Sequence, residues 1–247
     1  MENLDIRLRG AIKHFWKTRS IQNERQGAKS GKKDYGSRSA VTGGAQLDGF
    51  INLIKELLIE NGVPDVFIRA KKNTVLPGYF RPNKEWDLLV VANGNLIATI
   101  EFKSHIGPSF GNNFNNRIEE ALGNATDIWT AYREGAFKPS LRPWLGYLML
   151  LEEHPKSTGP VKVNEPYFKV FDVFRDASYV KRYELFCERL VRERLYDAAC
   201  FLISKKENGL HGNYKEPSEE LNFSKFVVSL ISRASALAKE FKRADEK

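Results

Sequence analysis

Two acidic residues and a lysine lie at the ends of two apolar segments near the middle of the chain. Asp87 precedes the apolar residues 88–92, and Glu101 and Lys103 close the second segment. The segments flank Asn-Gly-Asn at 93–95, which predicts a β-hairpin. Charged groups at the ends of apolar strands are costly to bury unless they have a partner or a metal ion. The three residues are therefore either solvent-facing charges or a divalent-metal site suited to phosphodiester cleavage.

The register of this hairpin decides whether the two acids meet. Side chains alternate along a strand, so Glu101 and Lys103 share one face of the sheet. A regular two-residue turn would set Asp87 opposite Ile100, on the other face from Glu101. A three-residue turn, or a bulge with the same effect, pairs Asp87 with Glu101 and brings their Cβ atoms to roughly 4.5–5.5 Å. Two carboxylates at that spacing can hold one Mg²⁺, so the metal site requires one of these two geometries.

The Asp-(x)n-Glu-x-Lys pattern resembles the PD-(D/E)xK nuclease signature, with Trp86 in place of the usual proline. The flanking sequences add to this likeness. They are AVTGGAQLDGF at 40–50, EFKSHIGPSFGNNFNNR at 101–117 and WTAYREGAF at 129–137. Together with the chain length, they resemble the XhoI family of type II restriction endonucleases over most of the chain.

This resemblance implies Mg²⁺-dependent hydrolysis of double-stranded DNA within the palindrome CTCGAG or a close variant, leaving 5′-phosphates and 5′ overhangs. Asp87, Glu101 and the backbone carbonyl of Phe102 would bind one or two Mg²⁺ ions. Lys103 would orient the attacking water and help to stabilise developing negative charge. A palindromic site implies a two-fold symmetric homodimer. A cognate DNA methyltransferase would act on the same site without having to bind the nuclease.

Nucleases of this superfamily often take a further metal-binding carboxylate from the first core helix. Asp48 and Glu56 are the candidates here, although a solvated helix face explains both equally well. Two rival functions remain: another nuclease on the same core, such as a repair or junction-resolving enzyme, and a non-catalytic DNA-binding module. The intact acid, acid and lysine set argues against the module, because binding to phosphate alone favours the loss of carboxylates.

Composition is that of an ordinary globular protein with a basic surface. The chain has 247 residues, 42% of them hydrophobic, and a net charge of +8, which favours nucleic acid as a partner over an anionic membrane. We expect a single domain spanning 1–247. Two cysteines are too few for a disulfide framework. No signal peptide and no apolar run of about 18 residues is expected, so we predict a cytoplasmic bacterial or archaeal protein with no membrane contact.

Two segments are predicted to contact DNA. Residues 25–39 interleave glycines with cations and read as a mobile basic loop that binds phosphate, or else as a solvated linker. Its candidate cations are Lys29, Lys32, Lys33 and Arg38. The second segment opens a helix expected at 114–134, and its side chains can contact base edges or simply cap the helix. Its candidates are Asn112, Asn113, Asn115, Asn116 and Arg117.

Four cations between 71 and 84 and one histidine have weaker claims. Lys71, Lys72, Arg81 and Lys84 either contact phosphate beside the active site or belong to a solvated loop. His105 either touches substrate or is an ordinary polar residue. Further helices are expected at 4–26, 45–61, 178–194 and 223–242, and further strands at 66–70, 143–151 and 197–204. This alternation predicts an α/β fold with a mixed central β-sheet flanked by helices, which agrees with the restriction-endonuclease-like core that the resemblance implies.

Overall fold

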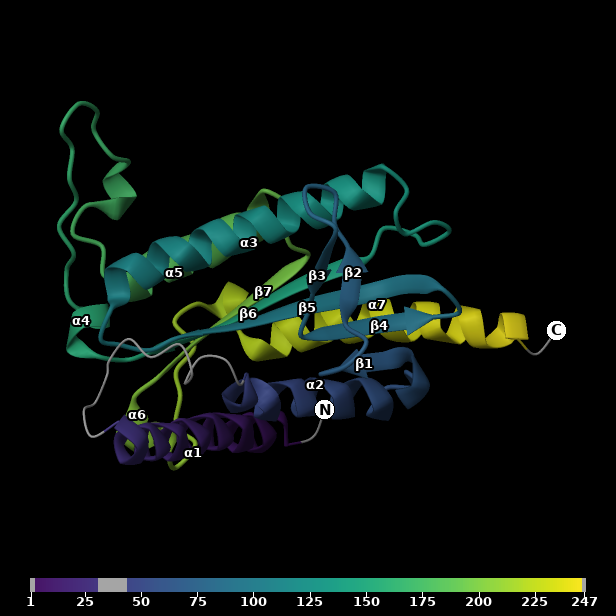
Figure 1. Cartoon of the computed structure of the whole chain (residues 1–247), viewed down its shortest axis with the longest axis horizontal. Coiled ribbons are helices and arrows are strands. Elements are labelled where there is room, and N and C mark those ends of the chain that lie inside the picture. The colour runs from purple at the N-terminus through teal and green to yellow at the C-terminus, as the bar shows by residue number, and fades with distance from the viewer. Residues whose placement is uncertain (1–2, 31–43, 246–247) are drawn as a thin grey trace.

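A computed structural model describes residues 3–30 and 44–245 of the chain. Its centre is a five-stranded sheet with the strand order β1-β4-β5-β6-β7 (Figure 1). The strands are β1 (Ile68–Ala70), β4 (Leu88–Ala92), β5 (Asn95–His105), β6 (Trp144–Glu152) and β7 (Ala198–Ser204). The β1-β4-β5 pairs are antiparallel and the β5-β6-β7 pairs are parallel. The predicted mixed α/β sheet is confirmed.

Helices cover both faces of the sheet (Figure 1). One face packs on α1 (Leu4–Ser30), α2 (Asp48–Glu60) and α7 (Phe223–Asp245), and the other on α3 (Phe110–Arg133) and α5 (Tyr179–Arg192). Each face has its own apolar cluster, because alternate residues of every strand point to opposite sides. Strand β6 is apolar almost throughout because it is buried on both faces. No described helix is long and apolar enough to cross a membrane.

Short elements connect this framework. They are the 3₁₀ turns η2 (Ala45–Leu47), η3 (Asp65–Phe67), η4 (Asp172–Phe174) and η5 (Glu219–Leu221), the one-turn helices α4 (Pro155–Thr158) and α6 (Lys206–Gly209), and the separate antiparallel pair of β2 (Val75–Pro77) and β3 (Asn83–Glu85). The β2–β3 pair lies in the segment predicted to be a loop. Strands of three residues, rich in polar side chains and proline, carry too little alternation to be recognised in the sequence.

Two predicted boundaries need correction. Helix α1 continues to Ser30, so residues 25–30 of the predicted loop are helical, and residues 31–43 lie outside the described part of the chain. Helix α3 begins at Phe110, with Ser109 at its N-cap, rather than near residue 114 with an asparagine cap. The Phe110 ring stacks at 5.6 Å from His154 and at 6.0 Å from Tyr179. This packing anchors a first turn that helix propensity alone disfavours.

The hairpin between β4 and β5 adopts one of the two geometries that the metal site requires. Ala92 pairs with Asn95 across a two-residue turn whose residues both have positive φ, as a type I′ turn demands. The register then shifts, because Val91 pairs with Leu96 but Val90 pairs with Ala98. Residue 97 is therefore an extra residue in β5, a β-bulge. From this point Leu88 pairs with Ile100, so the preceding residue 87 faces residue 101.

Candidate active site

Asp87 and Glu101 form an acidic cluster, and Glu101 is its buried centre. It lies on the face of β5 that packs on α3 and α5, beside Tyr147 of β6, and is 2% exposed. Its Oε1 is 2.5 Å from the Lys103 ammonium, and its Oε2 is 2.8 Å from the Lys84 ammonium. Burial opposes its charge, but the two lysines outweigh burial and hold the pKa of Glu101 below its ordinary value. Glu101 is therefore a carboxylate at neutral pH.

Asp87 lies directly before β4 and is tied to β5 through the backbone. Its Oδ2 accepts a hydrogen bond of 2.7 Å from the N–H of Phe102. Burial, followed by repulsion from Glu101, raises the pKa of Asp87 to about 6. Two carboxylates that repel each other in a partly desolvated site are what a bound cation would relieve.

The oxygen donors at this cluster fit Mg²⁺. The two carboxylates and the Phe102 carbonyl are hard oxygen ligands, which magnesium prefers. Among the described residues, no group of three or more histidine, cysteine or acidic side chains could hold a metal. An ion held by Asp87 and Glu101 would therefore draw its other ligands from backbone, water and substrate phosphate, as magnesium commonly does.

Lys103 completes the predicted set on the same face as Glu101. Burial lowers the pKa of Lys103, but the carboxylates of Glu101 and then Asp87 raise it by a larger amount. The net pKa therefore lies above the ordinary value. The ammonium also lies 3.8 Å from Glu120 of α3, which in turn pairs with Arg117 at 3.1 Å. The structure thus brings Asp87, Glu101 and Lys103 together and links them to the helix that carries the asparagines.

The two accessory-acid candidates lie in different places. Asp48 begins α2, and its Oδ2 is 2.7 Å from the ammonium of Lys71. Lys71 directly follows β1, where Ala70 pairs with Leu88. Asp48 therefore reaches the end of the sheet at which Asp87 lies.

Glu56 lies two turns further along α2 and is directed away from the acidic cluster. Its carboxylate pairs at 2.8 Å with Arg7 of α1 and is 60% exposed. Helix α2 packs on the face of the sheet opposite to Glu101. The structure does not bring Glu56 to the cluster.

The asparagine segment forms the first two turns of α3. Asn112, Asn115 and Asn116 are exposed, and Asn113 is half-buried. None of the four amides hydrogen-bonds to another described residue. They are available to a ligand, and Arg117 on the same helix is half-buried beside Glu120. Of the basic segment, Lys29 belongs to α1, while Lys32, Lys33 and Arg38 lie outside the described residues.

The weaker candidates have structural partners. His105 is buried, with Nδ1 at 2.8 Å from the Tyr183 hydroxyl and Nε2 at 3.2 Å from the Ser109 carbonyl. A carbonyl can only accept, so Nε2 donates. Burial lowers the pKa of His105 to about 4. Arg81 is held by Asp127 at 2.7 Å and Asn124 at 2.7 Å. Both side chains therefore serve the fold.

Two residues of the site were not predicted to be part of it. Lys84 was expected either to contact phosphate beside the active site or to lie in a solvated loop; it contacts Glu101, and Glu120 was not considered. Lys84 reaches the site from β3, a strand that the sequence pattern did not show. Glu120 could have been found from its position three residues after Arg117, which places both on one face of a helix.

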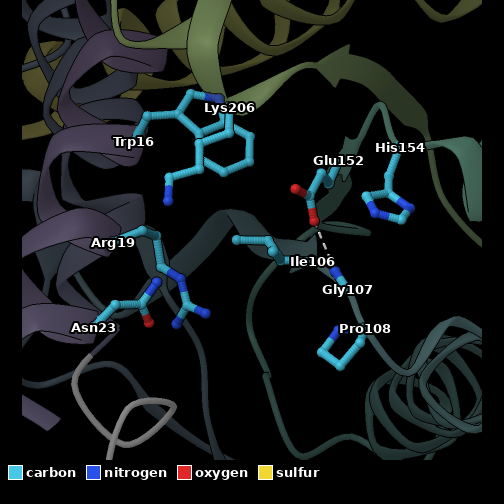
Figure 2. A pocket seen from close by; sticks show the side chains of 9 residues that line it. All are labelled: Trp16, Arg19, Asn23, Ile106, Gly107, Pro108, Glu152, His154 and Lys206. Carbon is cyan, nitrogen blue, oxygen red and sulfur yellow. Dashed lines mark hydrogen bonds between the residues drawn. The ribbon is translucent and has the colours of Figure 1, made fainter. Parts of the chain in front are cut away.

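A polar pocket of about 220 Å³ opens where β5 and β6 end (Figure 2). Its lining includes Gly107, whose N–H donates a hydrogen bond of 2.8 Å to Glu152 Oε2. Arg19 and Asn23 of α1 face it from one side, and His154 and Lys206 from the others. The pocket lies beside the turn that leads into α3, and none of the acidic cluster lines it.

A mixed sheet whose hairpin sets an aspartate opposite a Glu-x-Lys sequence defines a restriction-endonuclease-like nuclease core. The comparisons with known proteins agree. The chain belongs to the XhoI restriction endonuclease family, since the model of that family, restriction endonuclease XhoI, matches residues 26–216. It is accordingly a type II site-specific deoxyribonuclease.

Three relatives carry this assignment. The type II restriction enzyme BstVI of Geobacillus stearothermophilus is 54% identical over 83% of this chain and 94% of its own length. The type II restriction enzyme XhoI of Xanthomonas vasicola is 45% identical over 73% of this chain and 72% of its own. The type II restriction enzyme AbrI of Azospirillum brasilense is 46% identical over 68% and 76%. No solved structure gives a significant match.

Proposed function

We propose that this type II restriction endonuclease uses Mg²⁺ to hydrolyse double-stranded DNA at CTCGAG or a close variant, leaving 5′-phosphates and 5′ overhangs. Membership of the XhoI family supports the proposed recognition sequence and the proposed type of DNA end. One observation carries the chemistry: the bulge at residue 97 sets Asp87 against β5 opposite Glu101, with Lys103 at 2.5 Å from that carboxylate.

The chain's own residues would position the reacting groups. Asp87, Glu101 and the carbonyl of Phe102 would hold the metal ion. When bound, Mg²⁺ would offset charge on the scissile phosphate and ease deprotonation of the attacking water. The Lys103 ammonium, fixed by Glu101, would orient that water and stabilise the negative charge that develops on the phosphoryl oxygens. Its raised pKa keeps it charged for this role.

DNA contacts would come from two directions. The unpaired amides at 112, 113, 115 and 116 would enter a groove, since asparagine can bond both edge groups of adenine. Arg117 would contribute from the next position of the same helix. Lys29, Lys32, Lys33 and Arg38 would contact phosphates and supply affinity without sequence choice. Asp48 would be the accessory acid in preference to Glu56, because it lies at the end of the sheet where Asp87 lies.

A palindromic site is read most simply by a two-fold symmetric pair of chains, so we propose a homodimer. In the cytoplasm the host genome would be protected by a cognate methyltransferase that modifies the same palindrome and need not bind the nuclease.

Digestion of a sequenced plasmid tests this proposal directly. Purified protein should cut the plasmid into discrete fragments with Mg²⁺ and leave it intact with EDTA. Sequencing the ends should locate every cut at CTCGAG or a close variant, with 5′ overhangs. Cutting at unrelated positions, or equal cutting in EDTA, would overturn it.

A further inference from the structure

Lys84 is a second lysine on the buried carboxylate of Glu101. It belongs to β3, outside the central sheet, and its side chain is only 12% exposed. Its ammonium lies 2.8 Å from Glu101 Oε2 and donates to the carbonyl of Glu85 at 2.8 Å. The same ammonium lies 4.4 Å from the centre of the Trp86 ring. A lysine this buried and this well coordinated belongs to the site rather than to the solvated surface.

Together, the two lysines occupy both oxygens of the Glu101 carboxylate. Lys103 is on Oε1 and Lys84 on Oε2. Each oxygen keeps a second lone pair, but a metal ion bound there would lie beside an ammonium group that repels it. Lys103 lies on β5 itself, two residues from Glu101, whereas Lys84 is carried by the separate β2–β3 pair. The contact of Lys84 is therefore the one that can be released without disturbing the sheet.

The charges explain what such a release would achieve. Asp87 and Glu101 supply two negative charges and the two lysines two positive ones, so the metal-free cluster is close to neutral when all are ionised. A divalent ion would add two positive charges beside both ammonium groups, which is unfavourable in a desolvated site. A DNA phosphate would bring back negative charge at the same place.

We propose that Lys84 holds the place of the metal cation on Glu101 and moves onto the substrate phosphate when the ion binds. This inference rests on the proposed role of Glu101 as a metal ligand. Its consequence is coupling: metal binds weakly without DNA, and each ligand strengthens the binding of the other. Lys84 thus delays assembly of the site until substrate is present.

Calorimetric titration of Mn²⁺ without DNA tests whether Lys84 holds the place of the metal ion. Lys84→Met keeps the aliphatic stem against Trp86 and removes the charge, so it should bind Mn²⁺ at least about tenfold more tightly than the wild type. Lys84→Arg keeps the charge and should bind as weakly as the wild type. Lys169→Met is the matched control, since it removes an exposed lysine from the segment between α4 and α5 and should change nothing.

The coupling is measured by repeating the Mn²⁺ titration with a duplex whose scissile phosphate is replaced by a non-hydrolysable analogue. Duplex should strengthen metal binding to the wild type and have a much smaller effect on Lys84→Met. Thermal unfolding of each variant shows that it is folded, and Lys84→Gln replaces Lys84→Met if that variant is not. Equal Mn²⁺ affinity of the folded neutral variant and the wild type would overturn the inference. Plasmid cutting by the wild type tests the proposed function separately, so the two failures are distinct.

Discussion

The backbone N–H of Phe102 donates a hydrogen bond of 2.7 Å to Asp87 Oδ2, which ties the first acid to the strand that carries the second. The bond fixes the Asp87 carboxylate beside Glu101 although their repulsion favours separation. The backbone of β5 therefore supplies part of the preorganisation that a metal site needs.

Replacing Glu101 should separate cleavage from binding. Glu101→Ala removes a metal-binding oxygen pair, so Mg²⁺-dependent cutting should be lost. Affinity for DNA should stay within about tenfold, and can rise because repulsion with phosphate is removed. Plasmid digestion and a filter-binding titration measure the two effects. Undiminished cutting would contradict the assignment. Glu101→Gln, which preserves the buried volume, controls for loss of structure around the two lysines.

Asp48 and Glu56 form a matched pair on one helix. Asp48→Asn should raise the Mg²⁺ concentration needed for half-maximal cutting several-fold, because Asp48 lies at the end of the sheet that carries Asp87. Glu56→Gln should leave it unchanged, because that carboxylate pairs with Arg7 on the other face. Magnesium titrations of the initial cutting rate provide the comparison. The same effect from both variants would show that helix α2 acts only through stability.

The basic segment should supply affinity that does not depend on sequence. A double variant, Lys32→Ala with Lys33→Ala, should weaken binding to specific and unrelated duplexes alike. If both lysines contact phosphate, the slope of log affinity against log salt should fall by about 2. Anisotropy titrations at several salt concentrations measure this slope. A loss confined to the specific duplex would mean that these lysines read bases instead.

His105 should make the fold sensitive to acid. Its pKa is about 4 in the folded protein and about 6.5 when unfolded, so its contribution is complete above pH 6.5 and is lost as pH falls towards 4. The loss should be on the order of 3 kcal/mol. His105→Gln cannot take up this proton, so its free energy of unfolding should fall less over the same range.

Urea denaturation of the wild type and of His105→Gln at pH 7 and pH 4.5 isolates the contribution of His105 to stability, because the carboxylates are common to both proteins. Asp87, whose pKa is raised to about 6, has the opposite sign: it favours the folded state at low pH and loses this contribution as pH rises through 6. Parallel pH profiles for wild type and His105→Gln would show that the histidine does not titrate as described.

Much of the fold was predictable because long segments with a regular pattern of apolar residues specify it. The runs that became β6, α2 and α7 were each placed within a few residues. The helix expected at 178–194 is α5, and the Ser178 side chain caps it by accepting from the N–H of Lys181 at 3.2 Å. These elements depend on local signals of burial and capping, which a single sequence carries.

The site was predictable only up to its register. Residue types indicated the acids and Lys103, but a two-residue turn with a bulge and a three-residue turn give the same pairing. The sequence cannot separate them, since both satisfy the alternation beyond residue 97. The contact of Lys84 with Glu101 depended on tertiary structure, because it requires the short β2–β3 pair to lie against the face of the sheet that carries Glu101.

Strand β5 and helix α3 are separated by only four residues, and His105 fastens the end of one to the start of the other. Its Nε2 meets the Ser109 carbonyl, and its ring lies 4.9 Å from that of Phe110. These contacts join the strand and the helix firmly across the short connection. If α3 enters a groove as proposed, a base pair that displaces α3 would also displace Glu101 and Lys103 from the phosphate. Discrimination between DNA sites would then change the rate of the chemical step more than the affinity for DNA.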